Sequence, residues 1–326
     1  MDTFLASMAK NTKREGLNFE FLFNKYKETW KTHSPSSVRA NTYWFNNFIL
    51  PYFKNYLITQ IKMEDIIAFQ NRLRTTPSKR TKEPITDSSI KDITAQLKSF
   101  MNYCVDNDYI SKVPFSKRYT AVSIEEKKDI VIWGIDDFSN FIQFYNDDLA
   151  KKTLFTFLFS TGVRKEELLG LEKCDFDFEN NSVEIRRTYQ FIGGVEYLSN
   201  KMKTKTSRRT LDLPKPLMLL IKEYLDANPY FSETDRIFPF KPRRINKWMD
   251  FGIKKTDVPR TTPKGLRHSF VSNAIDKGMS ITAVQHYVGH ATPRTTLDVY
   301  AHCCRKGSKA ICSIFEQELN DLLLVS

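Results

Sequence analysis

Apolar side chains in the first third of the chain recur at the three- and four-residue spacing of amphipathic helices. Four such sets stand out: Phe19, Leu22, Phe23 and Tyr26; Trp44, Phe45 and Phe48; Ile66, Ile67, Phe69 and Leu73; and Ile90, Ile93, Leu97, Phe100 and Met101. Thr86 and Asp87 are typical of a helix start before the last set. We therefore predict an all-α domain of about four helices over residues 17–113, after a polar tail or linker at residues 1–16.

The pattern changes twice in the middle of the chain. Residues 114–132 are charged and show little periodicity, which indicates an interdomain linker. Helical spacing returns in two stretches, at 136–146 and 148–160. Alternation of apolar and polar positions then predicts three strands, at 182–186, 195–198 and 209–213, with a turn at Gly193-Gly194. We expect these strands to form one small antiparallel sheet inserted in a helical domain.

Proline and glycine divide the last part of the chain into short helices. Pro214, Thr262-Pro263 and Thr292-Pro293 each mark a helix start, Gly278 a helix end and Ser280 a further cap. Together with the preceding segments they predict a second domain over residues 133–307. The apolar stripe of a last helix, at about 308–323, leaves residues 308–326 as a separate element. The predicted fold class is mainly α with a small antiparallel β-sheet insert.

The charge balance indicates a polyanionic partner. The chain carries 50 Lys and Arg residues against 38 Asp and Glu, a formal net charge of +12. Residues 1–118 alone hold 19 basic against 11 acidic side chains. Such an excess is typical of proteins that bind nucleic acid or an anionic membrane. No apolar run reaches the ~20 residues of a membrane span, so we expect a DNA clamp without membrane association.

Cysteine use and the chain start favour a cytoplasmic protein. The five cysteines have no zinc-ribbon spacing, and the first residues lack the basic and apolar regions of a signal peptide. A metal site is the alternative for His286 and His290, with His302, Cys303 and Cys304 downstream. We expect neither metal nor cofactor, because adjacent cysteines rarely bind one ion and a glycine breaks the histidine pair.

The last fifth of the chain concentrates side chains suited to phosphodiester chemistry. Lys264, Arg267, His290 and Tyr300 lie on consecutive short helical segments, and Arg164 follows a Thr-Gly turn far upstream. Arginine binds phosphate as a fork, lysine or histidine can move a proton, and tyrosine can attack phosphorus and remain attached to it. These groups together can break and rejoin a phosphodiester.

The order of these motifs resembles that of the tyrosine recombinases, or phage-type integrases. The matching segments are Thr161-Gly162-Val163-Arg164, a hairpin with Lys203, Lys264-x-x-Arg267, Gly289-His290 and Tyr300. Each motif is weak alone, but five in the right order within a basic chain are specific. The resemblance covers about residues 17–325. It implies an N-terminal SAM-like core-binding domain and a C-terminal α+β catalytic domain.

The resemblance also implies roles for the clamp residues. Arg164 and Arg267 would neutralise the charge that develops on phosphorus, with Arg267 expected in the first turn of its helix. Glu167 would orient Arg164 rather than react. His290 would donate a hydrogen bond to the phosphate, and Tyr300 would be the nucleophile.

Two lysines complete the expected site. Lys203 would enter the minor groove and protonate the leaving 5′-oxygen, although its neighbours Lys201 and Lys205 compete for this role. Lys264 stands where the family more often has histidine. Because lysine keeps its charge at neutral pH, Lys264 suits electrostatic stabilisation better than proton transfer.

The expected partner is double-stranded DNA, and the expected location is a bacterial cell. The resemblance also implies a reaction that needs no ATP. The resemblance implies a homotetramer on two duplexes, assembled from protomers that can be monomeric in solution, with accessory DNA-bending or excision factors as further partners. The helix at 308–326 is expected to be exchanged between protomers, the alternative being packing on its own domain. Two rival functions remain at this point: relaxation of DNA, as by type IB topoisomerases, and a catalytically silent DNA-binding regulator.

Overall fold

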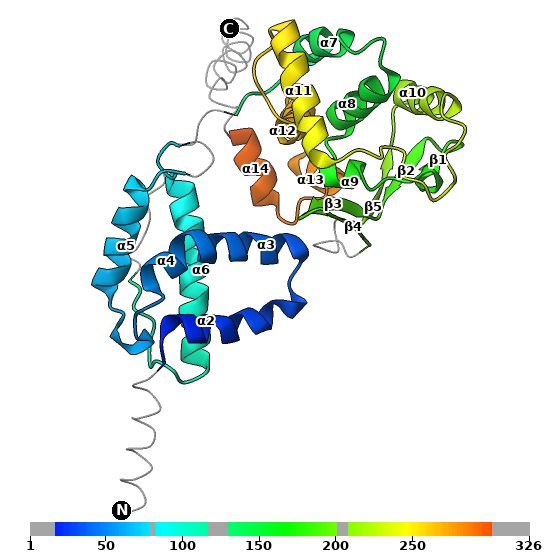
Figure 1. Cartoon of the computed structure of the whole chain (residues 1–326). Coiled ribbons are helices and arrows are strands. Elements are labelled where there is room, and N and C mark those ends of the chain that lie inside the picture. Colours follow the sequence, from blue (N-terminus) through cyan, green and yellow to red (C-terminus); the bar gives the residue numbers. More distant parts are fainter. Residues whose placement is uncertain (1–16, 79–81, 117–129, 201–207, 302–326) are drawn as a thin grey trace, which may run out of the picture. The chain divides into compact units, whose positions relative to one another are not determined.

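The computed structural model describes residues 17–78, 82–116, 130–200 and 208–301, and it divides into two compact units, Met1–Lys127 and Lys128–Ser326 (Figure 1). The first unit is built from helices. Its elements are α2 (Phe19–Glu28), η1 (Thr29–Thr32), α3 (Pro35–Trp44), η2 (Phe45–Ile49), α4 (Leu50–Phe53), η3 (Ile58–Gln60), α5 (Met63–Thr75) and α6 (Asp87–Asp106). Because α3, η2 and α4 follow one another without a break, the α-helices among the described residues of this unit form four segments, as the periodicity predicts.

Local capping and aromatic packing explain these helices. The side chain of Asn18 accepts from the Phe21 amide at 2.8 Å at the start of α2, and Thr86 caps α6. The core behind them is aromatic: Phe23 and Phe45 stack with ring centroids 4.4 Å apart, against the fully buried Phe100. Rings of this size bury much apolar surface each, so a few helices suffice for a stable core.

The second unit surrounds α8 with helices. Its elements are α7 (Ile135–Gln143), α8 (Leu149–Thr161), α9 (Lys165–Leu168), η4 (Lys173–Asp175), β1 (Phe176–Asp177), β2 (Ser182–Ile185), β3 (Thr188–Ile192), β4 (Val195–Ser199), β5 (Arg209–Asp212), α10 (Lys215–Asp226), α11 (Pro242–Thr256), α12 (Pro263–Asp276), α13 (Ile281–Val288) and α14 (Pro293–Ala301). Helix α8 packs against α7, α10 and α12 (Figure 1). Its Phe155, Phe157 and Leu158 are fully buried, which explains why this helix is apolar almost all round.

The predicted fold class is confirmed, but the prediction of a single sheet is wrong. Strands β1, β2 and β5 form one antiparallel sheet, while β3 and β4 form a separate hairpin. The turn of that hairpin is Gly193-Gly194, where both φ angles are positive, as two-residue hairpin turns require. The sheets separate at Arg186 and Arg187, which lie between β2 and β3 and whose side chains enter an ion network instead of a strand ladder.

Candidate active site

A glycine turn at the end of α8 determines where Arg164 lies. Gly162 has a φ of +61°, and a Cβ at this residue would lie 2.6 Å from Cδ1 of Phe270. The turn therefore requires glycine. The Thr161 hydroxyl fixes the preceding residue by donating to the Phe157 carbonyl at 2.7 Å. Because the chain leaves α8 in this way, Arg164 becomes the N-cap residue of α9.

Arg164 is held by a buried carboxylate and by a backbone carbonyl from far along the chain. Its Nη1 donates to Oε1 of Glu167 at 2.6 Å, and its Nη2 donates to the Gly289 carbonyl at 2.9 Å. Although burial alone would raise the pKa of Glu167, the guanidinium groups of Arg209 and Arg164 hold it below its ordinary value. Glu167 therefore remains ionised and fixes Arg164, whose side chain keeps 37% of its surface exposed.

Arg267 reaches the same stretch of backbone from α12. It is the fifth residue of that helix, so the prediction that it lies in the first turn is wrong by one position. Its Nη1 donates to the Gly162 carbonyl at 2.7 Å, and its Nη2 donates to the Val288 carbonyl at 2.8 Å. Burial, and then the charge of Arg164, lower the pKa of Arg267 to about 9. An anion beside the two guanidinium groups would offset this repulsion.

His290 lies directly after α13, where Gly289 caps the helix with a φ of +69°. The residue is 6% exposed, and its Nδ1 lies 2.9 Å from Oγ1 of Thr296. Burial, followed by the charges of Arg267 and Arg164, lowers the pKa of His290 to about 3. The imidazole is therefore neutral at pH 7, with one nitrogen that donates a hydrogen bond and one that accepts.

Of the remaining predicted residues, Tyr300 and Lys264 lie on helices of the second unit, and Lys203 lies outside the described residues. Tyr300 is the eighth residue of α14 and is half-buried; α14 packs on α12 and α13, the helices that carry Arg267 and lead to His290. Lys264 is exposed at the second position of α12. Lys203 and its competitors fall within 201–207, outside the described residues, and so does the predicted helix at 308–323.

Arg209 also belongs to this cluster, although it is not among the residues predicted from the sequence. It begins β5, and its side chain is 8% exposed. Its Nε donates to the Tyr287 carbonyl at 2.6 Å, and its Nη2 donates to Oε2 of Glu167 at 3.1 Å. Arg209 therefore connects β5 to Glu167, the carboxylate that holds Arg164. Strand β5 follows the segment that contains Lys203. The position of Arg209 in the Lys203-Thr204-x-x-Ser207-x-Arg209 pattern was the available signal.

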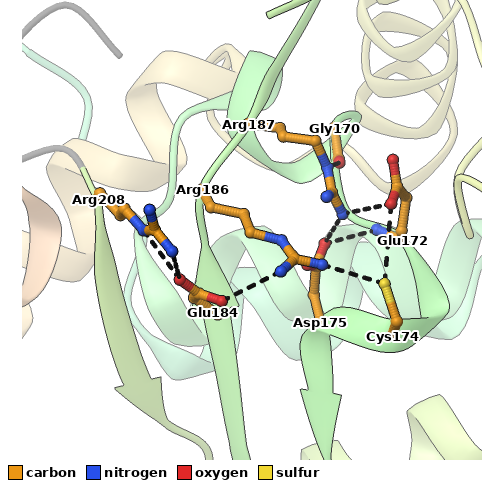
Figure 2. A network of polar contacts seen from close by, with 8 residues as sticks. All are labelled: Gly170, Glu172, Cys174, Asp175, Glu184, Arg186, Arg187 and Arg208. Atoms are coloured by element: carbon orange, nitrogen blue, oxygen red, sulfur yellow. Dashed lines mark hydrogen bonds and ion pairs between the residues drawn. The ribbon is translucent and has the colours of Figure 1, made fainter. Parts of the chain in front are cut away.

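An ion network stabilises the sheet from which β5 comes (Figure 2). Arg187 pairs with Glu172 at 2.7 Å and also donates to Asp175, while Arg186 pairs with the same Asp175 at 2.7 Å. Arg208 then donates to Glu184 on β2 at 2.8 Å, directly before β5. Positive and negative groups alternate, so the buried charges are compensated. Through Glu184 and Arg186, the network connects Arg208, directly before β5, to β2 and η4.

No helix among the described residues is long and apolar enough to cross a membrane. Within the same ranges, no group of three or more histidine, cysteine or acidic side chains is arranged to hold a metal ion. Of the alternative metal ligands, His302, Cys303 and Cys304 fall outside the described residues.

Two family models match this chain. The model described as "Phage integrase family" matches residues 135–306, and "Phage integrase, N-terminal SAM-like domain" matches residues 18–74. The first match alone spans more than half of the chain, and it contains Arg164, Arg267, His290 and Tyr300. The chain belongs to the phage integrase family. The predicted resemblance to tyrosine recombinases is thereby confirmed.

Relatives and solved structures of the same kind extend over almost the whole chain. A "Tyrosine recombinase XerC-like" protein of Caldanaerobacter subterraneus subsp. tengcongensis is 24% identical, covering 96% of this chain and 87% of the relative. The "ICEBs1 integrase" of Bacillus subtilis is also 24% identical, covering 95% and 85%. Among structures, the Tn1549 transposon integrase in complex with transposon right end DNA has a TM-score of 0.77 at 18% identity, covering 92% of this chain and 100% of that one. This likeness shows the shared fold.

Proposed function

We propose that the chain is a site-specific DNA recombinase that cuts and rejoins strands through a covalent bond between Tyr300 and a DNA 3′-phosphate. One observation carries this proposal. Arg164 and Arg267, which are 103 positions apart in the sequence, donate to the adjacent carbonyls of Gly289 and Val288 at 2.9 and 2.8 Å, directly before His290. Three phosphate-binding groups thus surround one short segment, and the helix of Tyr300 packs beside it.

The two arginines act as the phosphate clamp. Within the described residues, each guanidinium donates through its two terminal nitrogens to protein acceptors, and a guanidinium has five N–H groups in total. The remaining donors suit the non-bridging oxygens of a phosphodiester. Because Arg267 is buried, its interaction with an anion takes place in a low dielectric, where it is strong. The anion would also offset the repulsion between Arg267 and Arg164. Negative charge that develops on phosphorus during attack is neutralised there.

The reaction replaces one phosphoester bond by another at each step, and it therefore needs no external energy source. The Tyr300 oxygen attacks phosphorus and releases its proton to solvent water, while the bond from phosphorus to the 5′-oxygen breaks. The leaving oxygen takes a proton and becomes a free 5′-hydroxyl, and we assign Lys203 as the donor of that proton. Attack of a second 5′-hydroxyl on the phosphotyrosine reverses these steps. In this scheme Lys264, exposed on α12, contributes positive charge, and His290 donates a hydrogen bond to the phosphate.

The assembly follows from the need for two duplexes. We propose a homotetramer on paired DNA sites, in which residues 308–326 pass from one protomer to the next. The solved structure of a lambda integrase dimer bound to a COC' core site has a TM-score of 0.68 to this chain, at 13% identity, covering 92% of this chain and 82% of that one. The positive charge of residues 1–118 supports duplex binding by the first unit as well.

Strand exchange tests the proposed function against its rivals. Purified protein is incubated with two duplexes that carry different labels, drawn from a pool tiled across the DNA on both sides of its gene. We expect recombinant strands that join the two labels, without ATP. A supercoiled plasmid in the same reaction reports relaxation. Relaxation without strand exchange would indicate a topoisomerase, and binding without any covalent product would indicate a silent regulator; either result overturns the proposal.

A further inference from the structure

Thr296 makes a buried contact with the ring of His290 that the reaction scheme has not used. The residue is fully buried, and its Oγ1 lies 2.9 Å from Nδ1 of His290. The backbone of His290 is fixed separately, because its N–H donates to the Gln285 carbonyl at 3.1 Å and its carbonyl accepts from the Gln285 side chain at 3.2 Å. The contact with Thr296 therefore determines the orientation of the ring, not the position of the loop.

The location of Thr296 gives this contact a second consequence. Thr296 and Tyr300 are four positions apart on α14, one helical turn, so they lie on the same side of the helix. The hydrogen bond consequently joins the loop of His290 to the helix of the proposed nucleophile. A displacement of α14 relative to the loop of His290 would stretch or break this bond.

We propose that Thr296 is a positioning residue for both groups: its hydroxyl donates to Nδ1 of His290, which places the proton of the neutral ring on Nε2, and it holds α14 against the site. A neutral imidazole that accepts at Nδ1 must carry its proton on Nε2. Only that tautomer can donate to a phosphate held by Arg164 and Arg267 while Nδ1 faces Thr296. The inference rests on the proposed function, because it assigns Thr296 a role through His290 and Tyr300.

Three substitutions separate the hydroxyl of Thr296 from its volume. Thr296→Val keeps the shape and removes the hydroxyl, Thr296→Ser keeps the hydroxyl, and Thr296→Ala removes both should valine impair folding. Thr295→Val is the matched control, since Thr295 is an exposed neighbour on the same helix whose hydroxyl contacts Thr292 at 3.2 Å. Two quantities are measured for each protein: the histidine tautomer in the free protein, from ¹⁵N chemical shifts, and the single-turnover rate of adduct formation on nicked duplex.

We expect the wild-type protein and Thr296→Ser to show His290 with its proton on Nε2. Thr296→Val and Thr296→Ala should lose this preference and form the adduct about tenfold more slowly or worse, with unchanged DNA affinity. The rate for Thr296→Ser should remain within a few-fold of the wild-type rate, and the rate for Thr295→Val should equal the wild-type rate. Equal rates for Thr296→Val and wild type, or equal losses for serine and valine, would overturn the proposal. So would a wild-type ring with its proton on Nδ1.

Failure of the proposed function would look different. If wild-type protein formed no adduct, or if Tyr300→Phe still formed one, the reaction scheme would be wrong. The tautomer measurement would still decide whether Thr296 donates to His290, because it is made on the free protein and needs no DNA.

Discussion

Glu167 is the residue on which the geometry of the site depends most. Its carboxylate is 1% exposed and accepts from both Arg164 and Arg209, at 2.6 and 3.1 Å. A buried carboxylate is costly unless it is fully paired, and here two guanidinium groups and the Arg164 amide pair it. Glu167 thus holds Arg164, one arginine of the proposed phosphate clamp, in place.

At the residue scale, alanine at either clamp arginine should slow cleavage more than it weakens binding. In the proposed scheme, Arg164→Ala and Arg267→Ala each remove a donor that acts on charge developing in the transition state. We expect adduct formation on bound DNA to fall by on the order of 10²-fold or more. The measurement is single-turnover cleavage at saturating protein, with DNA affinity measured in parallel. A loss confined to affinity would remove the arginine from the phosphate clamp.

The depressed pKa of His290 predicts a stability that depends on pH. Its folded-state pKa is about 3, below the ordinary value of 6.5, so the unfolded chain binds the proton more readily. The stability is therefore complete above about pH 6.5 and is lost as the pH falls toward 3. His268, with a pKa of about 4 through burial and the charge of Lys264, acts in the same direction.

Urea unfolding between pH 7 and pH 4.5 measures this effect. Each histidine should contribute a slope that approaches about 1.4 kcal/mol per pH unit. His290→Asn should be less stable at pH 7 but should lose less stability on acidification than wild type. Parallel curves for the two proteins would show that His290 is not held neutral in the fold.

Most members of the proposed site are visible in the sequence, and those that are not have a physical reason for it. Arg164, Arg267, His290 and Tyr300 were selected because their chemistry and order are visible in one chain. Arg209 and Thr296 act through partners 42 and 6 positions away, Glu167 and His290. Local spacing does not distinguish Thr296 from any other helix threonine, and the Lys203-Thr204-x-x-Ser207-x-Arg209 pattern does not show which carboxylate Arg209 pairs with. Only the folded chain shows that their side chains are buried against those partners.

At the element scale, the turn after α8 connects the fold to the clamp. The Gly162 carbonyl accepts from Arg267, and the same residue turns the chain toward Arg164. Its backbone conformation and its contact with Phe270 both exclude a side chain. One residue therefore positions both arginines, from α12 and from the start of α9.

Gly162→Ala should consequently impair both stability and catalysis. The left-handed backbone costs an alanine about 1–2 kcal/mol, and its Cβ would also have to displace Phe270. Gly278→Ala is the matched control, since Gly278 has a φ of +88° and a Cβ at this residue would meet no other atom within 4 Å. We expect the control to lose only the backbone term and to keep its cleavage rate. Equal effects of the two substitutions on unfolding and cleavage would contradict this role of Gly162.

Helices and strands could be predicted from the sequence where apolar residues repeat on one face. They were harder to predict where charged side chains interrupt that repeat. Helices α7 and α8 lie within one to three residues of their predicted bounds, at Ile135–Gln143 and Leu149–Thr161. The division into two sheets was missed because Arg186 and Arg187 are used for ion pairs, which alternation cannot show. Helix α11 was missed although Ile245, Met249 and Ile253 repeat every four residues, because its polar remainder masks the stripe.

At the scale of the whole molecule, the proposed assembly depends on residues 308–326. Their apolar stripe needs a hydrophobic groove, because exposing it would cost on the order of 1.5–3 kcal/mol for each side chain. The proposed groove belongs to the next protomer, which would tie cleavage to assembly. These residues lie outside the described ranges, so the proposal rests on the sequence pattern and the family.

Deletion of residues 308–326 should therefore leave folding and single-site DNA binding largely intact and abolish pairing of two duplexes. Cleavage by the shortened protein should be weak or no longer dependent on assembly. Thermal unfolding, gel mobility on one site and sedimentation with two sites measure the three properties. Unfolding of the shortened chain as a monomer would place the helix in the core of its own domain.

The identity of the nucleophile is the claim on which the reaction scheme rests, and one covalent product measures it. Wild-type protein, Tyr300→Phe and Tyr287→Phe are each incubated with nicked duplexes tiled across the DNA on both sides of the gene. Adducts are resolved on a denaturing gel and mapped by mass spectrometry. We predict that the wild-type adduct joins a DNA 3′-phosphate to the peptide containing Tyr300. Tyr287→Phe should retain this adduct, and Tyr300→Phe should bind DNA normally and form none. An adduct that persists in Tyr300→Phe, or that maps to another residue, would contradict the assignment.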